Sequence, residues 1–180
     1  MYTLTKRFGL VYGHRLWNQT APPCQCRHLH GHSGHVIISV TNNKIKEIDT
    51  STGVWQSHNG DTLNQGMVMD LNNLKHFKTE LEWLDHKMIL DKNDPLVPIF
   101  LGLGGAVSIE NRGPFVVVSA IGDTVEDEIV DGLVLMDGEP TSENLARLIY
   151  HWVNEWLPDG VWCDSVAVEE TESNRAEYRL

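Results

Sequence analysis

The chain has 180 residues, close to the roughly 150 residues of an average domain, so the sequence predicts one domain over residues 1–180. Apolar residues make up 41% of the chain, which is ordinary for a globular protein and excludes wholesale disorder. The formal net charge of −11 excludes the basic surface that sequence-independent binding to nucleic-acid phosphates requires.

The cysteines, the first residues and the length of the apolar runs indicate in which cellular compartment the protein is expected. The three cysteines cannot all pair within one chain and show no C-x-x-C spacing, which favours a reducing, cytoplasmic setting over a disulfide scaffold. The first residues contain no apolar signal segment. No apolar run approaches the roughly 20 residues that cross a bilayer. We therefore expect a cytoplasmic protein without a membrane partner.

The first elements in chain order are two predicted strands. Apolar side chains alternate at Phe8, Leu10 and Tyr12, which is typical of a strand within the first 20 residues. Residues 20–26 contain two prolines and are predicted to form a loop. Residues 29–42 are rich in β-branched side chains and are predicted to form the second strand.

A connection and a helix follow. Residues 45–65 are rich in Asp, Ser, Gly and Asn and are predicted to connect the strand to the next elements, beginning with a short strand over 67–69. Either Asp70 or Asn72 can cap a helix. The helix is predicted from apolar residues at helical spacing. These residues are Leu74, Phe77, Leu81 and Leu84.

The second half of the chain predicts further strands and one clear helix. Residues 114–121 and 132–136 are strand-like, and the acidic stretch 123–131 between them is predicted to be a solvated loop or short turn. Thr141 is the expected N-terminal cap of a helix that carries one apolar stripe. Pro158 and Gly160 are expected to end this helix. The last strand is predicted over 161–171. This element order indicates an α+β fold with an antiparallel sheet and helices on one face.

Histidines are the unusual feature of the composition, because five of the nine lie in the first 35 residues. His30 and His32 are two residues apart, so in a strand both side chains point to the same face. Two neutral imidazoles side by side suit one edge of a zinc site, and His14 can supply a third ligand. The alternative is that the pair is a coincidence or a pair of exposed strand residues.

The other two early histidines fit a ligand role less well. His28 shares the parity of His30 and His32 but precedes the predicted strand, and His35 has the opposite parity. We expect both to be bystanders.

Thiols and carboxylates lie near this pattern or follow it. Cys24 and Cys26 precede the histidine pair, and a nearby cation would make either thiolate available as a base or nucleophile, unless both are small apolar loop residues. Asp85 could fix the tautomer of His86 if that histidine reaches the same pocket. Glu170, on an inward face, would need a partner such as an amidine or guanidine edge, and is otherwise a solvated glutamate.

Taken together, these residues resemble the family of 6-pyruvoyl-tetrahydropterin synthase and 6-carboxytetrahydropterin synthase. The resemblance runs from the first predicted strand to the last. It rests on motifs that occur in one order: His14-Arg15-Leu16, Cys26-Arg27-His28-Leu29-His30-Gly31-His32, Gly66-Met67-Val68-Met69-Asp70, Leu84-Asp85-His86, Pro140-Thr141-Ser142-Glu143-Asn144 and Val168-Glu169-Glu170-Thr171.

The resemblance implies the tunnelling fold, an antiparallel four-stranded sheet with two helices on one face. It also implies homo-oligomers, often hexamers, with active sites at subunit interfaces. Two departures stand out. The family pattern after Asp85-His86 usually ends in Leu-Asn, which is absent here, and residues 92–138 form an inserted segment that could cover the site or alter assembly.

The resemblance also implies a role for each matched residue. His14, His30 and His32 become zinc ligands, while Cys26, Asp85 and His86 become catalytic. Glu170 becomes the anchor of a pterin ring, with Thr141 and Ser142 beside it. Arg15 and Arg27, with Lys87 as a weaker candidate, are predicted to bind the triphosphate of the family substrate, 7,8-dihydroneopterin triphosphate.

Two reactions share such a site, so the resemblance leaves the product open. One gives 6-pyruvoyl-tetrahydropterin by loss of triphosphate. The other gives 6-carboxytetrahydropterin, with loss of acetaldehyde and triphosphate, early in 7-deazaguanine (queuosine-type) biosynthesis. Cys26 stands four residues before His30, with Leu29 between them, as in the carboxy-forming enzymes. Cys24 stands six before, as in the pyruvoyl-forming ones. A catalytically silent zinc- or pterin-binding barrel is the remaining alternative.

Overall fold

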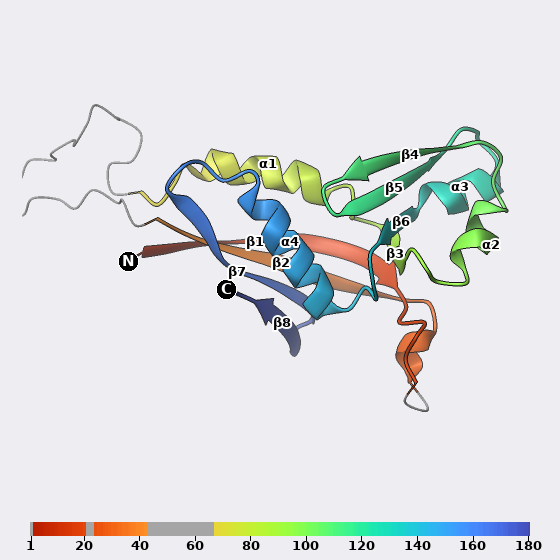
Figure 1. Cartoon of the computed structure of the whole chain (residues 1–180), viewed down its shortest axis with the longest axis horizontal. Coiled ribbons are helices and arrows are strands. Elements are labelled where there is room, and N and C mark those ends of the chain that lie inside the picture. The colour runs from red at the N-terminus through yellow and green to blue at the C-terminus, as the bar shows by residue number, and fades with distance from the viewer. Residues whose placement is uncertain (1, 21–23, 43–66) are drawn as a thin grey trace, which may run out of the picture.

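A computed structural model describes residues 2–20, 24–42 and 67–180 (Figure 1). In this part of the chain a single eight-stranded sheet has the strand order β4-β5-β6-β3-β1-β2-β7-β8. Among the described residues, no helix is both long enough and apolar enough to span a membrane.

One half of the sheet is antiparallel and carries both predicted N-terminal strands. β1 (Tyr2–His14) pairs with β2 (His30–Asn42), and the register places His14 opposite His30. β7 (Val161–Thr171) pairs with β2, and β8 (Asn174–Tyr178) pairs with β7 and forms the edge of the sheet. The sequence pattern did not predict β8. The predicted strands over 29–42 and 161–171 are confirmed.

The other half of the sheet comes from residues 87–136. β3 (Lys87–Asp91) runs parallel to the end of β1, and β6 (Leu133–Met136) runs parallel to β3. β5 (Phe115–Ala120) and β4 (Val107–Arg112) then add an antiparallel pair. The expected four-stranded antiparallel sheet is therefore wrong in number and in direction, because β3 pairs with the edge of β1 and the inserted segment 92–138 adds β6, β5 and β4 beyond it.

The helices cover both faces of the sheet. α1 (Leu71–Leu81) and α4 (Ser142–Asn154) pack through the main core onto one face. α2 (Val97–Leu101) and α3 (Val125–Asp131) pack onto a second, smaller core that includes the opposite faces of β3 and β6. Successive strand residues divide between them, since Ile89 lies in the first core and Leu90 in the second. The prediction that the helices lie on one face of the sheet therefore holds for α1 and α4 but not for α2 and α3.

Two local predictions are confirmed at the helix caps. The Asp70 carboxylate accepts a hydrogen bond from the Asn72 backbone N–H at 2.8 Å, and Thr141 Oγ1 accepts one from the Asn144 N–H at 3.2 Å. Each side chain satisfies one of the N–H groups that the first turn of a helix leaves unpaired.

Two local predictions are wrong, and one falls outside the structure. Residues 67–69 form no strand, because Val68 and Met69 are buried without a partner strand. Residues 123–131 hold α3 instead of a loop, capped by Thr124 and Asp127, which bond reciprocally. The predicted connection over 45–65 lies outside the described residues.

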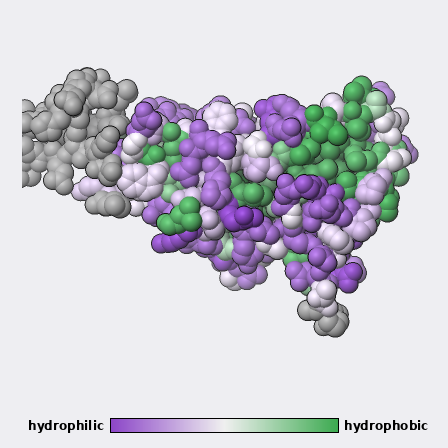
Figure 2. Space-filling view, in the orientation of Figure 1, coloured by the Kyte–Doolittle hydropathy of each residue, from purple (hydrophilic) through white to green (hydrophobic). Residues whose placement is uncertain are grey.

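The inserted segment also carries apolar side chains on the surface. Figure 2 shows them gathered at the end of the molecule where β4, β5 and α3 lie. The exposed large apolar residues of this segment are Ile99, Leu103, Ile109, Ile121, Val125 and Ile129.

Candidate metal centre and its cavity

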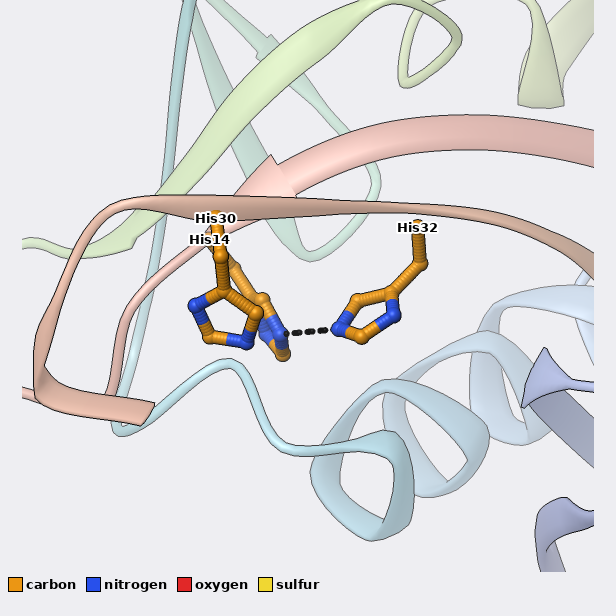
Figure 3. A group of neighbouring side chains, drawn as sticks. All are labelled: His14, His30 and His32. Carbon is orange, nitrogen blue, oxygen red and sulfur yellow. Dashed lines mark hydrogen bonds between the residues drawn. The ribbon is translucent and has the colours of Figure 1, made fainter. Parts of the chain in front are cut away.

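Three histidines converge on one face of the sheet. His14 ends β1 and lies opposite His30 at the start of β2, and His32 follows two residues later on the same face. One ligand nitrogen from each lies within 4.8 Å of the others, and His14 Nε2 is 3.1 Å from His32 Nε2 (Figure 3). The predicted trio is therefore brought together.

Backbone carbonyls fix the protonation of two of these rings. His14 Nδ1 lies 2.6 Å from the carbonyl oxygen of Pro140, and His30 Nδ1 lies 2.8 Å from that of His28. A carbonyl oxygen can only accept, so Nδ1 must carry the proton in each ring. In the neutral form of each ring the lone pair is then on Nε2, which is the arrangement that orients metal-ligating histidines.

The donor set and its surroundings fit a zinc ion. His14 is 2% exposed, and its burial lowers the pKa of the ring, which keeps the imidazole neutral. Two nitrogens bound tetrahedrally to zinc stand roughly 3.3 Å apart, close to the 3.1 Å between His14 Nε2 and His32 Nε2. Three imidazoles also leave one tetrahedral position open, as catalytic zinc sites do.

The histidines open onto a cavity of about 590 Å³. Its lining combines the ligands with one thiol, hydroxyls and carboxylates, all within a single copy of the chain. The lining residues are His14, Leu16, Gln19, Gln25, Cys26, His30, His32, Thr141, Ser142, Glu143, Glu170 and Asn174. Seven predicted site residues thus share one cavity. Sequence reasoning missed Asn174, because β8 was not predicted.

Glu170 presents a carboxylate to this cavity from β7. The Ser142 hydroxyl, in the first turn of α4, donates to Glu170 Oε1 at 2.5 Å. His14 Nε2 lies 4.0 Å from the same oxygen. The side chain is 22% exposed, so the carboxylate can still accept hydrogen bonds from a ligand in the cavity.

Cys26 is held in a short 3₁₀ turn, η1 (Gln25–Arg27), beside the histidines. Its backbone carbonyl accepts from the Leu16 N–H at 2.8 Å. Burial, followed by contact with the Cys24 thiol and the charge of Glu170, raises the pKa of the Cys26 thiol above its ordinary value. Cys26 therefore carries its proton at neutral pH. Cys24 is half-buried and is not among the residues that line the cavity.

Asp85 and His86 lie outside this cavity. His86 lines a separate, apolar cavity of about 540 Å³ together with Gly13 and Gly31, which lie on the opposite face of the sheet from His14. The Asp85 carboxylate accepts from the Val11 N–H at 2.8 Å and from His86 Nδ1 at 2.9 Å. The carboxylate can only accept, so the second bond requires His86 Nδ1 to carry a proton.

The backbone of this pair is also constrained. His86 has a φ of 59°, in the left-handed region that non-glycine residues rarely adopt, and its side chain is 74% exposed. Such a conformation persists only where the surrounding structure imposes it, as at functional sites. The exposed imidazole is directed by its own backbone and by Asp85.

The predicted triphosphate-binding cations do not line the histidine cavity. The Arg15 guanidinium forms an ion pair with the buried Asp94, and the Lys87 ammonium donates to the Asp131 carbonyl at 2.8 Å. Arg27 is exposed on η1. Asp94 is a further residue that the sequence pattern did not single out.

Comparison with known proteins gives a match over almost the whole chain. A family model described as 6-pyruvoyl tetrahydropterin synthase matches residues 3–180. A 6-carboxy-5,6,7,8-tetrahydropterin synthase from Aquifex aeolicus is 24% identical over 196 residues, which covers 99% of this chain and 98% of that protein.

Solved structures show the same fold. An uncharacterized protein from Wolinella succinogenes is 29% identical, with a TM-score of 0.76 over 99% of this chain and 97% of the other. A catalytic-residue mutant of Plasmodium vivax 6-pyruvoyltetrahydropterin synthase is 15% identical with a TM-score of 0.56 over the same shares. The Caenorhabditis elegans 6-pyruvoyl tetrahydropterin synthase is 18% identical with a TM-score of 0.54, covering 99% and 95% of the two chains.

Proposed function

The chain belongs to the 6-pyruvoyl tetrahydropterin synthase family, and from this premise we propose that it is a zinc-dependent lyase. The proposed reaction converts 7,8-dihydroneopterin triphosphate and water to 6-carboxy-5,6,7,8-tetrahydropterin, with release of acetaldehyde and triphosphate, in the cytoplasm and early in 7-deazaguanine biosynthesis. The observation that carries the proposal is one cavity lined by three converging imidazoles, a thiol and a carboxylate.

Glu170 and the start of α4 bind the pterin ring in this proposal. The amino group and the ring N–H of a pterin form a planar donor edge, which a carboxylate accepts with both oxygens. The Ser142 hydroxyl already holds Glu170 Oε1, and Thr141 lines the cavity beside it. The helix therefore fixes the direction in which Glu170 points.

In this proposal the three histidines would hold the metal. Zinc bound by His14, His30 and His32 supplies Lewis acidity that makes the hydroxyl groups of the substrate more acidic. The bonds to Pro140 and His28 keep two rings in the ligand tautomer before any metal arrives. The protein therefore needs little reorganisation to bind it.

Proton transfer requires groups on two sides of the substrate. Cys26 lies in the same cavity as the histidines, where its thiol can exchange a proton with a bound substrate. His86 Nε2 can accept one, because Asp85 holds its Nδ1–H. Since His86 lies on the other face of the sheet, we propose that the Asp85–His86 pair serves the cavity of a neighbouring copy in a homo-oligomer, a hexamer by family resemblance.

The triphosphate needs a cation near the cavity. Arg27 is exposed and adjoins Cys26, so we assign it this role. Arg15 was predicted with it, but its guanidinium is engaged by Asp94. Arg27→Ala is expected to raise KM more than it lowers kcat.

The carboxy-forming reaction is favoured over the pyruvoyl-forming one by two observations. Cys26, four residues before His30, lines the cavity, and the relative from Aquifex aeolicus carries the name of the carboxy-forming enzyme. Cys24 has the spacing of the pyruvoyl-forming enzymes but is absent from the lining.

The test is to incubate the zinc-loaded protein with 7,8-dihydroneopterin triphosphate and identify the products by mass spectrometry. Acetaldehyde together with 6-carboxytetrahydropterin is the expected result. A 6-pyruvoyl product would support the alternative lyase. No turnover by protein that holds stoichiometric zinc would leave a silent binding protein. His30→Ala is the matched control, and it should lose both zinc and turnover.

A further inference from the structure

The connection that follows β1 is anchored at several points. It begins directly after the metal ligand His14. The Leu16 N–H donates to the Cys26 carbonyl at 2.8 Å, the Trp17 indole N–H donates to Asp91 at 3.2 Å, and the Asn18 N–H donates to Glu139 at 2.7 Å. A segment without regular structure is thus held between η1, β3 and the turn before α4.

Arg15 makes the strongest of these contacts. Its Nε donates to Asp94 Oδ2 at 2.7 Å, and a second guanidinium nitrogen donates to Asp94 Oδ1. This paired arrangement fixes the guanidinium in orientation as well as in position. The Asp94 side chain is 0% exposed and that of Arg15 is 18% exposed, so solvent screens the pair only weakly.

Asp94 is itself fixed by the backbone around it. Its N–H donates to the Asp91 carbonyl at 2.9 Å, and its Oδ1 also accepts from the Leu96 N–H at 2.8 Å. The Val97 N–H, at the start of α2, donates to the Asp94 carbonyl at 2.9 Å. The carboxylate therefore stands on a rigid turn of the inserted segment 92–138.

Arg15 lies between two residues that define the cavity. His14 precedes it, and Leu16, which holds Cys26, follows it. A displacement of the Arg15 backbone would move the His14 imidazole away from His32 and would shift the turn that carries the thiol. Small displacements matter here, because metal affinity depends on how ligands are held in place.

We propose that Asp94 is a positioning residue that, through Arg15, holds the metal ligand His14 and the thiol Cys26 in their places. The inserted segment thus helps to position residues of the histidine cavity without lining that cavity itself. This inference rests on the proposed zinc site, but it concerns residues that do not touch the metal.

The test compares Asp94→Asn with Asp137→Asn. Asn keeps the shape of Asp94 and one acceptor but removes the charge that holds Arg15. Asp137 is the matched control, because it forms an exposed ion pair with Lys92 near the same turn. We would measure the zinc dissociation constant by competition with a chromophoric chelator, and the alkylation rate of Cys26 by peptide mass spectrometry. Urea unfolding would report stability.

We expect Asp94→Asn to weaken zinc binding by about tenfold or more, as loss of partners behind metal ligands does, and to change the Cys26 alkylation rate. Asp137→Asn should change neither. Unchanged zinc affinity and alkylation in folded Asp94→Asn would overturn the positioning role while the zinc site stands. A wild-type protein that binds no zinc would instead refute the proposed function.

A second variant keeps the inference testable if Asp94→Asn does not fold. Arg15→Lys retains the charge opposite Asp94 but loses the planar pair of donors. We expect it to fold, with zinc affinity reduced in the same direction. An unchanged zinc affinity in Arg15→Lys would contradict the proposal, because the paired hydrogen bonds to Asp94 would then not be needed to position His14.

Discussion

The two thiols beside the histidines differ in what they face. Cys26 lines the cavity, whereas Cys24 contacts Cys26 and is absent from the lining. We predict that Cys26→Ala lowers kcat by about 10²- to 10⁴-fold, the range of a lost acid–base group, and that Cys24→Ala keeps most of the activity. Steady-state kinetics of the two variants provide the measurement. Loss of turnover in Cys24→Ala alone would reverse the assignment.

The buried His14 makes stability depend on pH in the metal-free protein. Its pKa is lowered by burial, so the folded state resists protonation while the unfolded chain takes up a proton below its ordinary value of 6.5. We predict that this contribution to stability is complete above pH 6.5 and is lost as pH falls through the lowered pKa. Urea unfolding at pH 7 and pH 5 should show a smaller decrease in His14→Gln than in wild type. Equal decreases would contradict the prediction.

The alternation of side chains along strands predicted the candidate metal-binding histidines, but it did not predict the residues that hydrogen-bond to them. His30 and His32 share a face because side chains alternate, and His14 meets them because β1 and β2 pair in register. The carbonyl that orients His14 belongs to Pro140, far along the chain, so no local pattern could reveal it. Asp94 is likewise far from Arg15 in the sequence, so no local pattern could reveal that the two side chains pair.

At the scale of elements, some predictions failed because a local signal was misread and one failed because tertiary packing decides the structure. Residues 123–131 are acidic and predicted as a loop, yet three carboxylates fall in the first turn of α3, where the helix dipole favours negative charge. Within the strand predicted at 67–69, Val68 and Met69 are buried in the core and pair with no other strand. β8 follows β7 after a tight turn, which ordinary turn patterns could have indicated.

The cap of α3 offers an element-scale prediction. Thr124 Oγ1 accepts from the Asp127 N–H at 3.1 Å, and the Asp127 carboxylate accepts from the Thr124 N–H at 3.1 Å. We predict that Thr124→Ala lowers the free energy of unfolding by about 1 kcal/mol, measured in urea, and leaves zinc affinity unchanged. Ser108→Ala is the control, because its only described hydroxyl bond is a weak one of 3.5 Å on the exposed β4. Equal stability in the two variants would argue against the cap.

The whole molecule places its candidate catalytic groups on opposite faces of one sheet. The histidines and Cys26 face α4, while His86 emerges 74% exposed on the other side, beside an apolar cavity. The residue types of both groups could be predicted from the sequence, but their separation could not, because it depends on how residues 85–91 join the edge of β1. A single copy therefore cannot bring Cys26 and His86 to one substrate.

This separation gives a prediction that depends on assembly. We mix Cys26→Ala chains with His86→Ala chains, each inactive alone, after dissociating and reassembling them together. If the cavity of one copy uses the His86 of another, random mixing in a symmetric oligomer restores about a quarter of the wild-type sites, because only a His86→Ala cavity served by a Cys26→Ala neighbour is complete. If one chain supplied both groups, every site would lack one of them and the mixture would stay inactive. Turnover of 7,8-dihydroneopterin triphosphate before and after reassembly distinguishes the two, and a mixture of either variant with itself serves as the control.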